Sequence, residues 1–374
     1  MRIVRPLLLP LLALACALVL STPSLANYLQ VNLVSDGFVA NTLVDPNLVN
    51  PWGLASSPTS PFWIADNGTG VSSLYNATTN TIPSLVVTIP GGSPIGITWN
   101  DNPSAFPVGP NTGAVFLFAS EEGRIAGWHP SLGTTASVQA DVPGASYTGL
   151  TMHTQTGNSL LYAADFAQGT VDVFDATVQP TLAGAFLDPN LPAGLSPFNV
   201  QVLGNEVYVA YARRDPVTGD EVPGAGLGLV NVFDRTGNLL RRVATGGTLN
   251  APWGLALAPA SFGEFAGALL VGNFGDGRIN AFDPLSGTFL GQVRNPNKAP
   301  IEIDGLWALR FGNDGGAGSA NELFFTAGIE DETHGLFGKL VVTRAIPEPE
   351  TLRLLAAALV MLIAVRGMVV RRPA

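Results

Sequence analysis

Short apolar stretches recur along the chain at intervals of about 43 to 55 residues. Each stretch is about five residues long and contains Gly-Leu or an equivalent pair, which is typical of a buried strand bounded by turns. The six stretches are 51–55, 94–98, 147–151, 197–201, 252–256 and 303–307. Their spacing lies in the range of propeller blades, so the pattern predicts six structural repeats.

Each repeat continues with two further strands joined by a tight polar turn. In the first repeat, residues 62–65 turn through 66–70 into a strand at 71–75, and the later repeats follow the same order. Glycine and Asx residues in the turns supply the positive φ that such hairpins require. A fourth strand, such as 84–89, leads to the next repeat. Six units of four strands predict an all-β fold, a six-bladed β-propeller with four-stranded blades.

The last repeat contains one strand too few. After Asp304 it has strands only at 306–311, 323–327 and 336–342, whereas residues 28–34 form a strand without a partner in the first repeat. We expect this N-terminal strand to complete the sixth blade and close the ring, because closure removes an exposed sheet edge.

The N-terminus has the pattern of a secretory signal peptide over residues 1–26. Arg2 and Arg5 precede an apolar run, and Ser24-Leu25-Ala26 is a small-x-small cleavage pattern. The alternative is a lipoprotein anchored through Cys16, but Ala13 stands where a leucine is expected. Cys16 is the only cysteine of the chain. Signal cleavage therefore leaves no thiol and excludes disulfides, zinc-thiolate sites and cysteine nucleophiles.

The C-terminus carries Pro347-Glu348-Pro349, an apolar run at 352–370, and then Arg371 and Arg372. Nineteen residues at about 1.5 Å each give roughly 28 Å of helix, close to the roughly 30 Å of a bilayer core. The terminal arginines belong in the cytoplasm, which leaves the preceding domain on the other side of the membrane. A plain single-pass anchor is one interpretation of this segment.

A more specific interpretation comes from the order of these three parts, which resembles the PEP-CTERM sorting tail of Gram-negative bacteria. The resemblance implies recognition by an exosortase-type processing enzyme, cleavage near Pro347-Glu348-Pro349 and an exopolysaccharide-producing lifestyle. We therefore expect a signal peptide (1–26), a β-propeller (27–345) and a sorting and transmembrane tail (346–374). The expected location is the inner membrane facing the periplasm, followed by the cell surface or the extracellular matrix.

The net charge of the mature domain limits the classes of partner that it can bind. Six of the 18 basic residues and two of the 28 acidic residues lie in the two terminal segments, which leaves a net charge of about −14 for the domain. Such a surface repels phosphate backbones and argues against nucleic acid and anionic lipid as partners. The candidate partners that remain are cationic ligands, Ca²⁺ or another divalent cation, neutral glycans and proteins.

The repeats themselves resemble two known patterns. They are similar to the NHL-type propeller repeat, with Pro-x-Gly-Leu-Ala followed by an Arg-Ile-x-x-Phe-Asp strand. Residues 273–283, 303–309 and 333–338 also resemble an uncharacterised bacterial propeller family, many of whose members end in PEP-CTERM tails. This resemblance implies a fold and a location, but no activity.

One face of the predicted propeller carries the candidate binding residues. It collects the second residue of each innermost stretch, namely Trp52, Ile95, Thr148, Phe198, Trp253 and Asp304. Large apolar residues there suit a plugged axis or a floor for sugar stacking. Asp304 introduces a carboxylate, and Asn199 replaces a repeated glycine, so both are candidates for a ligand or metal at the axis. Alternatively, they only hydrogen-bond strand ends.

Acidic turns lie on the same face. They include Asp66, Glu121, Glu122, Asp165, Asp276 and the run Glu330-Asp331-Glu332, and a longer loop adds Asp215, Asp220 and Glu221. His334 follows this run, and Glu330, Asp331 and His334 join Trp52, Phe198 and Trp253 as the candidate binding face. Flexible oxygen-rich loops suit Ca²⁺, although no stretch has EF-hand spacing. The alternative is that most of these carboxylates are turn residues or solvated surface.

Two classes of function follow. The first is a binding or interaction module for exopolysaccharide or protein. The second is a metal-dependent hydrolase or lyase that resembles gluconolactonase, a family whose axial metal is bound by Glu, Asn and Asp; Asn199 and Asp304 match two of these ligands, and Glu302 lies close to Asp304 in sequence. The chain has no Gly-x-Ser-x-Gly elbow, phosphate loop or His-Glu-x-x-His pair. We assign no catalytic residue and favour the binding module.

Overall fold

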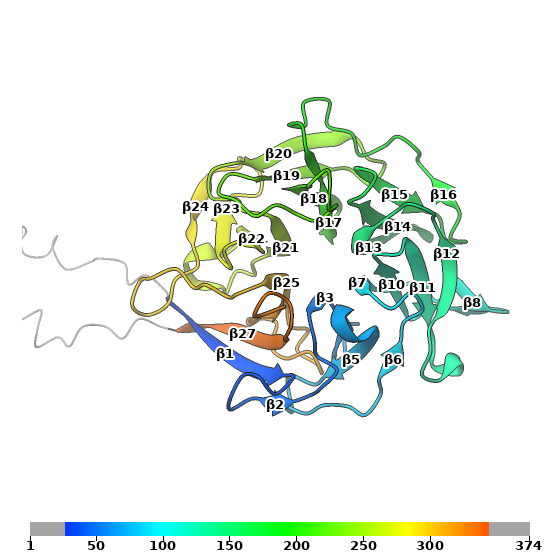
Figure 1. Ribbon diagram of the computed structural model, residues 1–374, viewed down its shortest axis with the longest axis horizontal. Helices are drawn as coiled ribbons and strands as arrows, with labels where there is room; N and C mark the ends of the chain where they lie inside the picture. The colour runs from blue at the N-terminus through cyan, green and yellow to red at the C-terminus, as the bar shows by residue number, and fades with distance from the viewer. Residues whose placement is uncertain (1–26, 344–374) are drawn as a thin grey trace, which may run out of the picture. The chain divides into compact units, whose positions relative to one another are not determined.

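Six β-sheets surround a central axis in the computed structural model, which describes residues 27–343 (Figure 1). The predicted signal peptide and sorting tail lie outside the described residues. Within those residues the chain is built almost wholly of strands, and the predicted six-bladed propeller is confirmed. None of the helices between residues 27 and 343 has the length and apolar character needed to cross a membrane.

The blades follow one another along the chain. Blade 1 contains β3 (Pro51–Ala55), β4 (Phe62–Asp66), β5 (Val71–Tyr75) and β6 (Val87–Thr88). Blade 2 contains β7 (Pro94–Trp99), β10 (Phe116–Ser120), β11 (Arg124–Trp128) and β12 (Ser137–Asp141). Blade 3 contains β13 (Tyr147–Gln155), β14 (Asn158–Asp165), β15 (Thr170–Phe174) and β16 (Pro180–Thr181). Blade 4 contains β17 (Leu195–Leu203), β18 (Glu206–Arg213), β19 (Gly228–Phe233) and β20 (Leu239–Thr245). Blade 5 contains β21 (Pro252–Leu257), β22 (Leu269–Asn273), β23 (Ile279–Phe282) and β24 (Phe289–Gln292).

Blade 6 joins the two ends of the domain. It contains β25 (Leu306–Phe311), β26 (Leu323–Ala327), β27 (Leu336–Thr343), β1 (Asn27–Ser35) and the short β2 (Leu43–Val44). The N-terminal β1 lies between β27 and β2, as predicted. Tyr28 of β1 is fully buried, and its hydroxyl donates to the Phe262 carbonyl at 3.1 Å. The N-terminal strand is thus both the closing strand and a contact with blade 5.

Four smaller elements lie outside the blades. A hairpin is formed by β8 (Pro107–Gly109) and β9 (Thr112–Gly113). Three short 3₁₀ turns are η1 (Asn67–Thr69), η2 (Pro130–Leu132) and η3 (Gly263–Phe265).

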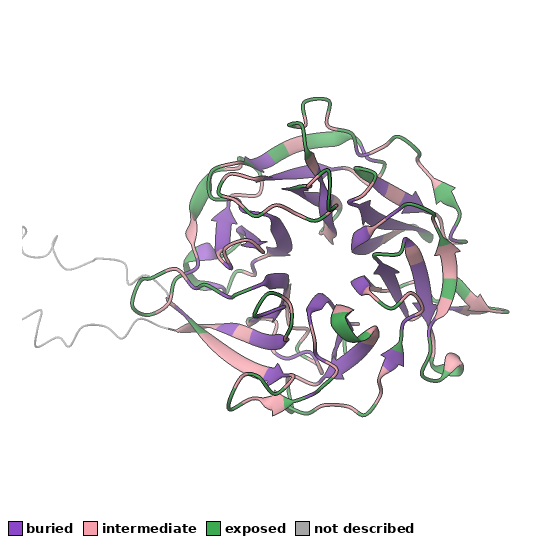
Figure 2. Ribbon diagram, in the orientation of Figure 1, coloured by how far each residue is buried: buried purple, intermediate pink, exposed green. Residues whose placement is uncertain are grey.

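The core lies between blades rather than at one centre. On β22, Leu269 and Val271 pack with residues of blade 4, whereas the intervening Leu270 packs with residues of blade 6. Both faces of such a strand are covered, which is why the inner strands are continuously apolar instead of alternating with polar residues. Figure 2 shows this burial on the inner strands and the exposure of the outer ones.

The repeated Gly-Leu pair has a steric cause. A Cβ added at Gly254 of β21 would lie 2.6 Å from the carbonyl oxygen of Trp307 on the neighbouring blade. The innermost strands of blades 5 and 6 therefore approach one another too closely for a side chain at Gly254. Glycine is required by this close approach of two backbones.

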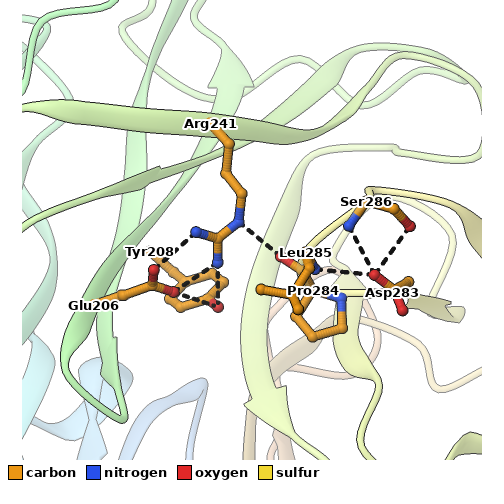
Figure 3. A network of polar contacts seen from close by, with 7 residues as sticks. All are labelled: Glu206, Tyr208, Arg241, Asp283, Pro284, Leu285 and Ser286. Atoms are coloured by element: carbon orange, nitrogen blue, oxygen red, sulfur yellow. Dashed lines mark hydrogen bonds and ion pairs between the residues drawn. The ribbon is translucent and has the colours of Figure 1, made fainter.

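Blades 4 and 5 are also joined by a polar clamp near the outside of the ring. Arg241 of β20 makes two hydrogen bonds to the Glu206 carboxylate at 2.8 and 2.6 Å, and its Nε donates to the Pro284 carbonyl at 2.8 Å. Figure 3 shows the guanidinium between these two acceptors. The planar guanidinium fork matches a carboxylate in this geometry, so the clamp links blade 4 to the turn after β23.

Candidate functional site

The axis is closed by aromatic rings near the face that holds the starts of the innermost strands. Trp52, Phe198 and Trp253 are 4, 0 and 5% exposed, and Trp307 from blade 6 is fully buried. Trp52 lies in edge-on contact with Phe198 and Trp253, with ring centroids 6.0 Å apart in both pairs. We call these four residues the aromatic plug. Its rings are packed against one another, so little of their surface is accessible to a ligand.

The register of blade 6 differs from the prediction. Leu306 pairs with the last residue of β26, as Pro51 and Pro252 pair with the last residues of β4 and β22. Trp307 therefore occupies the position of Trp52 and Trp253, and the alignment of Asp304 with that position was wrong. The cause is Gly305-Leu306, which imitates the repeated Gly-Leu pair three residues too early.

Asp304 and Asn199 have local hydrogen-bond partners. Asp304 precedes β25, is exposed, and accepts a hydrogen bond from the Glu330 N–H at 2.8 Å. Asn199 is buried on β17; its Nδ2 donates to the Trp253 carbonyl and its Oδ1 accepts from the Val200 N–H, both at 2.8 Å. Glu302 pairs with Arg278 at 2.6 Å. Between residues 27 and 343, no three His, Cys, Asp or Glu side chains are grouped to hold a metal ion.

His334, Glu330 and Asp331 belong to the loop between β26 and β27. The His334 Nδ1 lies 2.5 Å from Asp36 Oδ2, and its ring stacks on Phe38 with centroids 4.1 Å apart. Glu330, Asp331 and Glu332 have φ values of 53, 51 and 63°. Three successive left-handed residues other than glycine are unfavourable, by about 1–2 kcal/mol each, and such backbone is common at functional sites.

Several of the acidic turn residues serve their own turns. Asp66 Oδ2 accepts from the Ser73 N–H at 3.0 Å, Asp165 Oδ1 from the Gln168 N–H at 3.0 Å, and Asp276 Oδ1 from the Arg278 N–H at 3.2 Å. These carboxylates replace missing backbone partners within tight turns. For these three residues the structural interpretation is sufficient.

Other acidic residues meet at the top of the aromatic plug. Trp307 Nε1 donates to Asn50 Oδ1 at 3.1 Å, and Asn50 Nδ2 donates to Glu332 Oε2 at 2.6 Å. Asn50 Nδ2 also lies 3.3 Å from Asn67 Oδ1, and Asn67 Nδ2 donates to Glu121 Oε2 at 3.3 Å. These contacts join loops of blades 1, 2 and 6 directly above the plug.

Glu221, in the long loop between β18 and β19, adds blade 4 to this group. The charges of Glu332 and Glu121 contribute to the raised pKa of Glu221. We call Asn50, Asn67, Glu121, Glu221 and Glu332 the acidic mouth. The sequence places the three glutamates among many acidic turns without singling them out, and it gives neither asparagine a role in a site.

The electrostatics of the acidic mouth are unusual for surface carboxylates. The pKa of Glu221 is raised to about 7, mainly by burial among protein atoms and in addition by repulsion from Glu332, Asp220 and Glu121. The pKa values of Glu121 and Glu332 are also raised, again mainly by desolvation and then by neighbouring acidic residues. No Lys or Arg of residues 27–343 forms an ion pair with any of the three glutamates. The mouth is therefore a concentration of negative charge without a counter-charge from the described chain.

The fold and the acidic mouth together define a six-bladed β-propeller with a plugged axis and an anionic loop surface. No family model matches the chain. It is 33% identical to Uncharacterized protein R648 of Acanthamoeba polyphaga mimivirus over 338 residues, which cover 86% of this chain and 80% of that protein. It is 31% identical to Uncharacterized protein L690 of the same virus, over 84% of this chain and 86% of that protein. The chain belongs to the family of these two proteins.

Solved structures share the fold at low sequence identity. An auxiliary nutrient binding protein from Bacteroides thetaiotaomicron aligns with a TM-score of 0.57 at 13% identity, over 85% of this chain and 77% of that one. An α-L-arabinanase from Penicillium chrysogenum, complexed with arabinobiose, aligns with a TM-score of 0.52 at 11% identity, over 86% of this chain and 99% of that one. At these identities the likeness concerns the fold alone.

Proposed function

We propose that the protein is a binding module whose acidic mouth holds a positively charged amine or guanidinium group of its ligand. The observation that carries this proposal is the gathering of Glu121, Glu221 and Glu332 from three blades, with raised pKa values and without a cationic partner among the described residues. A ligand cation would relieve their mutual repulsion. Perturbed pKa values of this kind concentrate at functional sites.

The rigidity of the surroundings supports a binding role. Asn50 connects Glu332 to the indole of Trp307, which is fully buried in the plug. A side chain fixed through such a chain of hydrogen bonds loses little conformational freedom when a ligand binds, and this preorganisation favours affinity. The net charge of about −14 would in addition steer cationic ligands toward the domain.

A metal-dependent hydrolase or lyase is less well supported by the same residues. The amide of Asn199 is bonded to backbone groups, Asp304 caps the Glu330 N–H outside β25, and Glu302 pairs with Arg278. These interactions engage all three side chains elsewhere, so none of them is positioned to bind a metal at the axis. The architecture is shared with proteins named as nutrient binding proteins, which is compatible with a binding role.

The location of the module is a second part of the proposal, based on the sequence of the two termini. We propose export by the signal peptide at 1–26, and retention at the inner membrane by the PEP-CTERM-like tail at 346–374 until an exosortase cuts near Pro347-Glu348-Pro349. The propeller repeats would then be of the NHL type, within a PEP-CTERM-associated bacterial branch of the family. Intact mass and fractionation of the native protein, with and without the exosortase of its host, test this: an unchanged mass and location in both strains contradicts it.

The test of binding uses variants of the acidic mouth. Fluorescence anisotropy of a labelled hexalysine peptide is measured with the wild type, with Glu221→Gln/Glu332→Gln and with Asp101→Asn. Asp101 is an exposed carboxylate beyond the end of β7, on the opposite face. We expect the double variant to bind at least about tenfold more weakly, equivalent to about 1.4 kcal/mol, and Asp101→Asn to bind as the wild type does. If both variants bound the peptide equally weakly, the loss of affinity would come from the net charge of the protein. The acidic mouth would then be rejected as the binding site.

The ligand can present its amine on a protein or on an aminated polysaccharide. A chitosan hexamer measured beside hexalysine distinguishes these two sources. Binding of hexalysine alone assigns the mouth to a basic protein segment, and tighter binding of chitosan assigns it to a polysaccharide. Failure of both to bind the wild type contradicts the proposed function.

A further inference from the structure

A small cavity lies on the propeller axis and is lined by residues of all six innermost strands. Its volume is about 20 Å³. Its apolar lining comes from Leu54, Ile97, Leu150, Leu255 and Leu309, although polar atoms form the larger part of the cavity surface. Its polar side chains are Asn199, Gln201 and Arg310. The acidic mouth is not part of this cavity.

Arg310 lacks a counter-charge. Its only hydrogen bond to the described residues is a long one, from Nη2 to the Ser56 carbonyl at 3.4 Å. No carboxylate among residues 27–343 forms an ion pair with it. Burial by the surrounding protein lowers the pKa of the guanidinium. Arginine is nevertheless so strongly basic that the side chain stays charged at neutral pH. Arg310 is only partly exposed, and a partly desolvated charge without an ionic partner is costly, so a compensating group is expected.

Gln201 supplies a second donor in the same cavity. Its side-chain amide makes no hydrogen bond within the described part of the chain, whereas both side-chain atoms of Asn199 are bonded to backbone groups. The strand registers place Gln201 and Arg310 at the position that Ala55 and Ala256 occupy in blades 1 and 5. The two longest polar side chains at this repeat position therefore line the same cavity.

We propose that the axial cavity binds one small anion of chloride size, held by the Arg310 guanidinium and the Gln201 side-chain amide. The residues offer N–H donors and a positive charge, the complement of an anion. A volume of about 20 Å³ accommodates one species of roughly the size of a water molecule, which suits a monoatomic anion better than sulfate or phosphate. Arg310 keeps partial exposure to solvent, which provides a route of entry. The anion would neutralise the charge of Arg310 and brace blades 4 and 6 across the axis.

Thermal unfolding of the full-length protein tests the proposal. The melting temperature is compared in sodium chloride and in sodium gluconate at equal ionic strength, since gluconate is too large for the cavity. We expect chloride to raise the melting temperature of the wild type, because a ligand that binds only the folded state stabilises it. Arg310→Gln should lose this rise. Arg213→Gln, which removes an exposed arginine at the end of β18, should retain it.

A second measurement locates the anion directly. Crystals of the wild type grown with bromide should show an anomalous peak within hydrogen-bond distance of Arg310 and Gln201, and crystals of Gln201→Leu a weaker peak. The proposal is overturned if the wild type shows no such peak, or if Arg310→Gln gains as much stability from chloride as the wild type does. Should Arg310→Gln fail to fold, the bromide peak of the wild type decides. None of these outcomes depends on ligand binding at the acidic mouth.

Discussion

Trp52 and Trp307 stack face to face across the seam between the first and last blades, with ring centroids 3.3 Å apart and planes inclined by 18°. The same seam is held by Thr326, whose hydroxyl donates to the Trp52 carbonyl at 2.6 Å and accepts from the Ala308 N–H at 3.0 Å. Trp307 also donates to Asn50, the residue that bonds Glu332. Ring closure, the plugged axis and the acidic mouth are thus connected through one indole.

Deletion of residues 27–34 tests closure by the N-terminal strand. The deletion removes the buried side chains of Tyr28 and Val34 and leaves β27 with an unpaired edge. We expect a markedly lower melting temperature or aggregation. Thermal unfolding measures the first, and size-exclusion chromatography detects the second. Tyr28→Phe is the mild control, since it loses only the hydrogen bond to Phe262 and about 1 kcal/mol. A truncated protein as stable as the wild type would show that the ring does not need β1.

Gly254→Ala tests the close approach of the innermost strands. The new Cβ would lie 2.6 Å from the Trp307 carbonyl oxygen, so the neighbouring blade must move. We expect the free energy of unfolding to fall by about 1–3 kcal/mol, as measured by chemical denaturation. Gly109→Ala is the matched control: its Cβ would meet nothing closer than 4.0 Å, so its effect should stay within about 0.5 kcal/mol. Equal losses in the two variants would refute a steric cause.

The acidic mouth should reduce the stability of the ligand-free protein at neutral pH. Burial raises the pKa of Glu221 to about 7, so the folded state binds more protons than the unfolded state between about pH 4.5 and 7. Stability therefore falls as the pH rises through this window. We expect Glu221→Gln to be more stable than the wild type at pH 8 by about 1–3 kcal/mol and to show no gain at pH 4. A loss of stability at pH 8 would mean that the carboxylate is structurally required.

The clamp between Arg241 and Glu206 should have the opposite dependence on pH, because it stabilises the protein at neutral pH and not in acid. Hydrogen bonding to Arg241 lowers the pKa of the Glu206 carboxyl. Its stabilising effect is therefore fully present above the unfolded pKa of about 4.3 and is lost as the pH falls through the lower folded value. We expect Arg241→Gln to cost about 1–2 kcal/mol at pH 7, since both side chains are partly exposed, and much less at pH 2. A constant difference at the two pH values would assign the loss to packing of the arginine stem.

The sequence allowed the fold to be predicted because each blade repeats one pattern: a Gly-Leu strand, a polar turn and two further strands. The partner of the N-terminal strand followed from the missing strand of the last repeat. The register of blade 6 was misjudged because Gly305-Leu306 imitates the repeat, and only the pairing of Leu306 with Ala327 corrects it.

The acidic mouth was beyond sequence reasoning for a different reason. Glu121, Glu221 and Glu332 are about 100 residues apart along the chain, and they meet only after the ring has closed. In the sequence they are indistinguishable from turn residues such as Asp276. One pattern could have directed attention to Arg310, namely a charged residue within an otherwise apolar innermost strand. Its pairing with Gln201 required the corrected register.

Isothermal titration calorimetry at pH 8 tests the central claim most directly, with hexalysine and its fully Nε-acetylated form as the two ligands. The peptides have the same backbone and nearly the same length, and they differ in the charge of their six side chains. Recognition of a cation at the acidic mouth predicts measurable binding of hexalysine that weakens with added salt, and at least about tenfold weaker binding of the acetylated peptide. Equal affinity for the two peptides, or no binding of hexalysine at low salt, would contradict it.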